Sequence, residues 1–131
     1  MRFVLDTNAV IALLNDPDSK LARRARQHAP AQIGISAIVS HELFYGAFKS
    51  RRAERNVALV DSLPFEVVDF DKEDSRQAGE IRASLGVRGS PIGPYGVLIA
   101  GQAMARSLVL VSRNLREFAR VPGLQVEDWE T

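Results

Sequence analysis

The chain has 131 residues, of which 46% are hydrophobic and 25% are charged, which excludes disordered and fibrous classes and allows one buried core. It contains no cysteine, so disulfides and thiolate metal sites are excluded and a reducing compartment is expected. The net charge of +1 does not by itself indicate a nucleic-acid partner, although arginine supplies 14 of the 17 basic residues.

The first half of the chain alternates short apolar strands with helices. The sequence predicts strands at residues 2–5 and 32–36 and helices at residues 7–15, 19–28, 36–50 and 51–63. The first strand ends at Asp6, and an acid this early excludes the apolar core of a signal peptide. No apolar run reaches transmembrane length. We therefore expect a cytoplasmic protein with no membrane partner.

The second half continues the same alternation. The sequence predicts strands at residues 65–70, 107–112 and 124–129 and helices at residues 71–86, 94–106 and 114–120. Gly86 is expected to stop the helix that begins at residue 71. This order favours an α/β fold around a mostly parallel sheet, in a single domain covering residues 1–131. Ligands bind beyond the carboxyl ends of the strands in such sheets, so polar residues that follow strands are candidates for function.

Asp6 follows the first strand directly and is succeeded by Thr7 and Asn8. Aspartate is a favoured N-cap residue, so helix capping explains one of these three polar side chains. It does not explain all three. We therefore expect Asp6 to belong to a functional site, a role that is compatible with capping.

Glu42 lies in the apolar stretch "SAIVSHELFYGAF", on one helical stripe with Ile38 and Tyr45. A carboxylate on such a helix needs a partner or a metal ion when it is buried. Two interpretations stay open, an ion pair with an arginine and a cation site shared with Asp6, and the second is favoured. The neighbouring His41 faces another direction and is not expected to be a ligand.

Ser112, Asn114 and Glu117 follow the strand at residues 107–112. Asn114 and Glu117 have the spacing of a capping box, so a structural role and a role in the site are both open. Asp6, Glu42 and the polar residues at 112–117 come from three separate segments. All of them supply oxygen atoms as ligands, which suit Mg²⁺ or Mn²⁺. Such an ion can activate water and hold a phosphodiester, which is the chemistry of a hydrolytic nuclease. A site of this kind normally needs three or four acids.

Four stretches, "LDTNAVIALL", "ISAIVSHELFYGA", "RGSPIGPYGVLIAGQA" and "LVSRNLREFARVPGLQVEDW", resemble in order the motifs of PIN domains, specifically of VapC-type toxin ribonucleases. The resemblance implies an α/β/α sandwich on a short parallel sheet and an acid-lined pocket that binds Mg²⁺ or Mn²⁺ and cleaves RNA. It also implies a cognate antitoxin that inhibits the toxin, often through a C-terminal segment, and a homodimer or toxin–antitoxin hetero-oligomer.

The same resemblance assigns catalytic roles to five residues, which are Asp6, Glu42, Ser112, Asn114 and Glu117. Asp6 and Glu42 match the first two metal-binding acids. The third acid of the pattern, an aspartate, falls at position 96, where this chain has Gly96.

Glycine supplies no side-chain oxygen, so metal binding and nuclease activity are expected to be low or absent in this chain. Folding should survive, because a glycine near a helix end costs about 1 kcal/mol or less. Gly96 is either a detoxifying substitution or the mark of a natural inactive relative that still binds RNA or an antitoxin. Close helix packing at Gly96 is a weaker explanation, because Gly101 and Ala105 already provide a small-residue face.

Other classes fit less well. A receiver-like phosphotransferase needs a lysine after a late strand, and a haloacid-dehalogenase-like enzyme needs an aspartate where Asn8 stands. A pure binding module for an antitoxin or RNA is the main alternative to an enzyme. The RNA target is not encoded in a short motif. RNA contacts are expected from a group of exposed basic residues, Arg23, Arg24, Arg51, Arg52 and Arg88.

Overall fold

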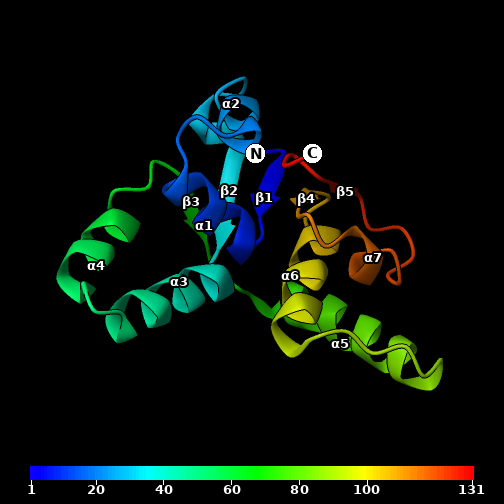
Figure 1. The fold of residues 1–131 in the computed structure, drawn as a ribbon. Coiled ribbons are helices and arrows are strands. Elements are labelled where there is room, and N and C mark those ends of the chain that lie inside the picture. Colours follow the sequence, from blue (N-terminus) through cyan, green and yellow to red (C-terminus); the bar gives the residue numbers. More distant parts are fainter.

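A five-stranded parallel sheet forms the centre of the computed structural model, which describes all 131 residues (Figure 1). Its strands are β1 (Phe3–Leu5), β2 (Ile33–Ser36), β3 (Glu66–Val68), β4 (Val109–Val111) and β5 (Val126–Glu127). They lie in the order β3–β2–β1–β4–β5. The predicted α/β fold with a short parallel sheet is confirmed.

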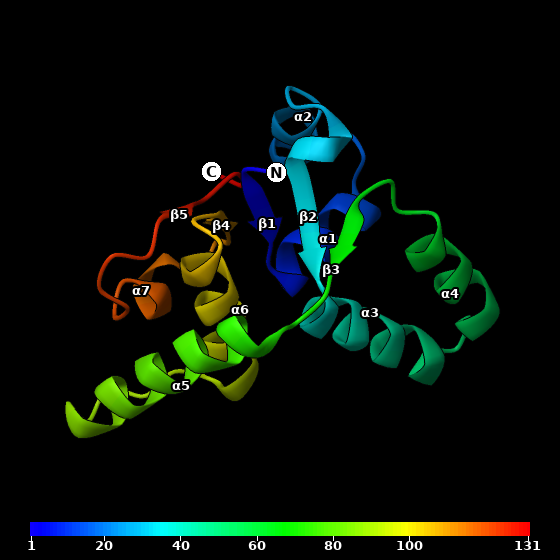
Figure 2. The same cartoon turned by 180° about the vertical axis from the view of Figure 1, so that it is seen from behind.

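Helices flank the sheet on both sides (Figures 1 and 2). They are α1 (Thr7–Asn15), α2 (Lys20–Ala25), α3 (Ala37–Lys49), α4 (Ala53–Asp61), α5 (Lys72–Val87), α6 (Pro94–Ala105) and α7 (Leu115–Phe118), with a short 3-10 turn at Pro30–Gln32. None of the helices is long and apolar enough to cross a membrane.

The predicted end of α5 is close, since the helix ends one residue after Gly86, but Gly86 is not the residue that stops it. The helix continues through Gly86 to Val87, and Gly89, with φ of +68°, is the residue that leaves it. The N–H of Gly89 donates to the carbonyl of Gly86 at 3.1 Å, and the N–H of Ser90 donates to the carbonyl of Leu85 at 2.9 Å. This pair of bonds is a Schellman motif, which requires the left-handed residue that glycine supplies most readily.

The core explains why the inner strands read as continuous apolar runs. Val4, Leu5 and Leu110 are fully buried, because helices cover both faces of a parallel sheet. The C-terminal end contributes as well. The ring centroid of Trp129 lies 4.9 Å from that of Phe3 and 5.4 Å from that of His28, so the end of the chain covers the amino end of β1. The predicted strand at residues 124–129 therefore shortens to β5 and a packed tail.

An ion pair links the start of α5 to the end of α6. Arg106 donates to the fully buried Asp74 at 3.0 Å, and Gln102 donates to the same carboxylate at 2.9 Å. Burial raises the pKa of Asp74, but hydrogen bonds from Arg106, the N–H of Asp71 and Gln102 outweigh it and hold that pKa below its ordinary value. The pair fixes one end of the α5–α6 hairpin.

The middle of that hairpin depends on a close approach at Gly101. A Cβ built at this position would lie 2.5 Å from the Cα of Ala78, which is closer than packed carbon atoms come. The predicted small-residue face of α6 is therefore a packing surface, and Gly101 is the residue that permits the contact.

We expect Gly101→Ala to lower the free energy of unfolding by about 1–3 kcal/mol, because the two helices must move apart. Gly79→Ala is the matched control on α5, since a Cβ there meets no atom within 4 Å. That variant should be stabilised by about 0.5–1 kcal/mol. Urea unfolding of both variants measures the difference, and equal effects at the two positions would contradict the close-packing account.

Candidate functional site

Asp6 lies at the carboxyl end of β1, where the strand order of the sheet reverses between β1 and β4. Its carboxylate accepts the N–H of Thr7 at 2.7 Å and the hydroxyl of Ser112 at 2.9 Å. Asp6 therefore caps α1 and also joins a second strand end, as the sequence analysis allowed. Burial raises the pKa of Asp6, and the nearby charge of Glu117 raises it further, whereas the hydrogen bonds from Ser112 and Thr7 lower it without cancelling the rise.

Ser112 and Asn114 connect Asp6 to Glu117 through a chain of hydrogen bonds. The buried Ser112 hydroxyl donates to Asp6 and accepts the N–H of Asn114 at 3.0 Å. The Asn114 side chain then donates to Oε2 of Glu117. The predicted set after β4 is thus brought together at the end of β1.

The capping-box interpretation of Asn114 and Glu117 is wrong. Asn114 makes no side-chain capping bond at the start of α7. Oε1 of Glu117 instead accepts the N–H of Gly93 at 2.9 Å, 24 residues away in sequence. Glu117 is therefore directed at the first turn of α6 rather than at its own helix.

Glu42 is positioned by Thr7, whose hydroxyl donates to its Oε1 at 2.9 Å. Glu42 forms no ion pair, so the expected alternative of a salt bridge to arginine is wrong. Thr7 is the residue that the sequence analysis missed as a positioning group, although it noted the polar side chain beside Asp6. One residue thus holds both acids, through its N–H on Asp6 and its hydroxyl on Glu42.

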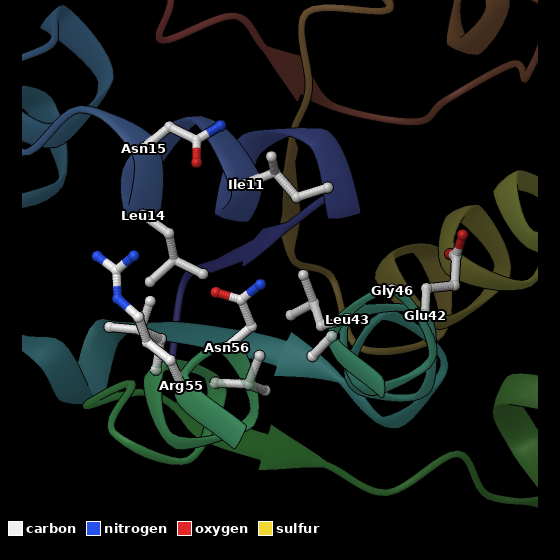
Figure 3. A pocket seen from close by; sticks show the side chains of 11 residues that line it. Ile11, Leu14, Asn15, Glu42, Leu43, Gly46, Arg55 and Asn56 are labelled. Atoms are coloured by element: carbon white, nitrogen blue, oxygen red, sulfur yellow. The ribbon is translucent and has the colours of Figure 1, made fainter. Parts of the chain in front are cut away.

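A hollow of about 440 Å³ lies between α1, α3 and α4, and Glu42 stands at its edge (Figure 3). Figure 3 shows the Glu42 carboxylate directed away from Arg55 and Asn56, which line the other side of the hollow. Glu42 is the only acid in its lining. The hollow therefore shares Glu42 with the acid site and includes neither Asp6 nor Glu117 in its lining.

Gly96 occupies the first turn of α6, opposite Glu117. A Cβ built at position 96 would lie 3.7 Å from Oε1 of Glu117 and 3.6 Å from the ring of Phe118, which are ordinary contacts. A larger side chain therefore has room to start here, unlike at Gly101. Close helix packing does not require this glycine, and a side chain at position 96 would begin beside the acid site.

The site offers oxygen donors alone, from Asp6, Glu42, Glu117 and the hydroxyl of Ser112. This chemistry fits a hard divalent cation such as Mg²⁺ or Mn²⁺. The acids that are present do not form a group of three close enough to hold an ion by themselves. The donor type fits, and the number of adjacent carboxylates is low for such a site.

The arginines predicted to contact RNA are spread over the molecule. Arg23 and Arg24 lie on α2, at the opposite end of the sheet from Asp6 (Figure 1), and Arg24 pairs with Glu127 at 3.4 Å. Arg51 and Arg52 connect α3 to α4, and Arg88 ends α5. These five do not form one surface.

A family model described as "PIN domain" matches residues 3–124. The chain is 42% identical over 131 residues to the tRNA(fMet)-specific endonuclease VapC of Salmonella typhimurium, covering 98% of each chain. The chain belongs to the PIN-domain family of VapC-type toxin ribonucleases. The resemblance recognised in the sequence is confirmed.

Solved structures of VapC-type proteins have the same fold as this chain. A crystal structure of DNA-bound VapBC from Salmonella typhimurium matches with a TM-score of 0.94 at 42% identity, covering 98% of both chains. VapBC2 of Rickettsia felis, bound to a promoter DNA fragment, matches with a TM-score of 0.92 at 34% identity, covering 98% of this chain and 99% of that one.

The raised pKa of Asp6 predicts that its charge destabilises the metal-free fold. The folded state binds the proton more tightly than the unfolded state, so stability falls as pH rises above the ordinary value of 3.8. We expect Asp6→Asn to raise the Tm at pH 7 in the presence of a chelator, and the gain to disappear as the pH falls below 3.8. Thermal unfolding of both proteins from pH 7 to below pH 3.8 measures the difference in Tm. A Tm gain that is independent of pH would contradict the electrostatic cause.

Proposed function

We propose that this chain is the toxin of a type II toxin–antitoxin pair and a divalent-cation-dependent endoribonuclease by ancestry, with activity impaired by Gly96. The observation that supports this most directly is the geometry at position 96. A side chain there would begin 3.7 Å from Glu117, and Glu117 is joined through Asn114 and Ser112 to Asp6.

Asp6 and Glu42 would hold the cation, Mg²⁺ or Mn²⁺, with Ser112, Asn114 and Glu117 in the catalytic group. When bound, the cation supplies charge stabilisation to the scissile phosphodiester and lowers the pKa of an attacking water. Thr7 orients both acids, and Ser112 keeps the Asp6 carboxylate fixed. Asn114 restrains the Glu117 carboxylate at the start of α6. The chain's own residues thus preorganise the acids before substrate arrives.

Gly96 removes a carboxylate from this arrangement. Fewer charged ligands weaken the binding of a cation, and an error of about 1 Å in placing a reactant can lower a rate by about 100-fold. A pure binding module for an antitoxin or RNA is the alternative, and Gly96 is the observation that favours it.

The relatives indicate the partners. The Salmonella typhimurium relative is named for its action on tRNA(fMet), and the Salmonella and Rickettsia structures are VapBC complexes. We propose that this chain likewise acts on a structured tRNA and is inhibited by a cognate antitoxin protein, as a homodimer or a toxin–antitoxin hetero-oligomer.

We expect Gly96→Asp to raise the rate of cleavage of an initiator tRNA in Mg²⁺ or Mn²⁺ by about 100-fold or more, because it restores a charged ligand. A gel assay of the end-labelled RNA measures the rate. Gly79→Asp is the matched control, since it adds the same side chain at an exposed position on α5.

The double variant Asp6→Asn with Gly96→Asp should return to the background rate. If folded Gly96→Asp binds Mn²⁺ and RNA without cleaving, the nuclease proposal fails and the binding-module alternative replaces it.

A further inference from the structure

The loop at residues 88–93 and the segment at residues 113–120 are joined by three hydrogen bonds. Arg88 donates from Nη2 to the carbonyl of Arg120 at 2.8 Å. Arg120 donates from Nη1 to the carbonyl of Pro91 at 2.9 Å. The third bond is the one between Gly93 and Glu117 in the acid site. The two arginines therefore lie on the same pair of segments as the candidate catalytic acid.

Arg88 and Arg120 are exposed, and neither forms an ion pair. Their partners are neutral backbone carbonyls, which leave the positive charge of each guanidinium uncompensated. The segment at residues 113–120, "RNLREFAR", contains three arginines and one acid. This corner of the molecule thus has a local excess of positive charge beside the acid site.

The hydrogen bonds also restrict the two side chains. A guanidinium has five N–H donors, and each tether uses a single Nη atom, so most of the donors stay available. A long side chain that is already held loses less entropy when a ligand binds. The planar fork of arginine suits the paired oxygens of a phosphate.

We propose that Arg88 and Arg120 form a phosphate clamp for the RNA backbone, next to the acid site. This inference rests on the proposed function, because RNA supplies the phosphate groups. Arg120 follows Glu117 by three residues, and their side chains contact Pro91 and Gly93 of the same loop. The clamp therefore holds the phosphates that neighbour the one presented to Asp6 and Glu117.

The α2 arginines are poorer candidates for the same task. They lie at the opposite end of the sheet from Asp6, and Arg24 is already paired with Glu127 and lies 5.7 Å from the ring of Trp129. A phosphate bound there would not be near the acids. Two exposed arginines without a carboxylate partner are also suited to bind an acidic segment of a protein. RNA binding and antitoxin binding of the variants are therefore measured separately.

The test uses Arg88→Gln and Arg120→Gln, singly and together. Glutamine retains an N–H donor for the carbonyl and removes the charge. Binding of a fluorescent initiator tRNA is measured at several salt concentrations in a chelator, so that cleavage does not contribute. The association constant K falls as salt rises, and each variant should make the slope of log K against log salt concentration less steep by about 0.7–0.9. Each variant should also weaken binding about tenfold near 100 mM salt. Arg120→Lys, which keeps the charge, should retain the slope.

Arg26→Gln is the matched control. Arg26 is also exposed and tethered to a carbonyl, that of Pro17 at 2.7 Å, but it lies at the end of α2. Its replacement should leave the slope unchanged. The clamp is overturned if Arg26→Gln has the same effect as the clamp variants, or if folded clamp variants bind RNA like the parent chain. Loss of antitoxin binding with unchanged RNA binding would assign the pair to a protein partner and overturn the RNA clamp.

Failure of the proposed function gives a different result. If the parent chain and Gly96→Asp both fail to bind the tRNA at low salt, RNA is not the ligand, and the clamp falls together with the nuclease proposal. If the parent chain binds the tRNA and the folded clamp variants bind it with the same affinity and salt dependence, the proposed function stands without the clamp.

Discussion

The hydrogen bond from Ser112 to Asp6, 2.9 Å long, joins the carboxyl ends of β4 and β1 at the point where the strand order reverses. The chain of hydrogen bonds that connects Asp6 to Glu117 begins with this bond. It fixes the carboxylate that caps α1, and the same hydroxyl accepts the N–H of Asn114, whose side chain reaches Glu117. A polar group buried at a strand end needs such a partner, and here the partners form a continuous network.

The second constraint comes from the α5–α6 hairpin, because it decides where position 96 lies. The Asp74–Arg106 pair fixes one end of the hairpin and the contact of Gly101 with Ala78 sets the spacing. Glu117 then meets the first turn of α6 through Gly93. The two glycines on α6 thus differ in whether the packing of the helix requires them. Gly101 is required by packing, whereas Gly96 leaves room for a side chain beside an acid.

The strand and helix order could be predicted from the sequence because apolar runs and their polar ends are local signals. The place of Asp6 at a strand end and its capping of α1 were predictable for the same reason, since it directly follows a buried strand. The glycine that stops α5 was not predictable, because Gly86 and Gly89 are both plausible stops and only the hydrogen bonds of the turn distinguish them. The capping-box prediction failed because Glu117 finds its partner 24 residues away. The pairing of Arg88 with Arg120 across 32 residues is equally absent from any local pattern.

In our proposal, position 96 is a missing ligand of a metal site built on Asp6 and Glu42. The most direct test is calorimetric titration of Mn²⁺ into the chain and into its Gly96→Asp variant at neutral pH. We expect the variant to bind Mn²⁺ at least about tenfold more tightly than the chain itself, because it gains a charged ligand. Equal affinity in the two proteins would show that Gly96 does not mark the place of a ligand.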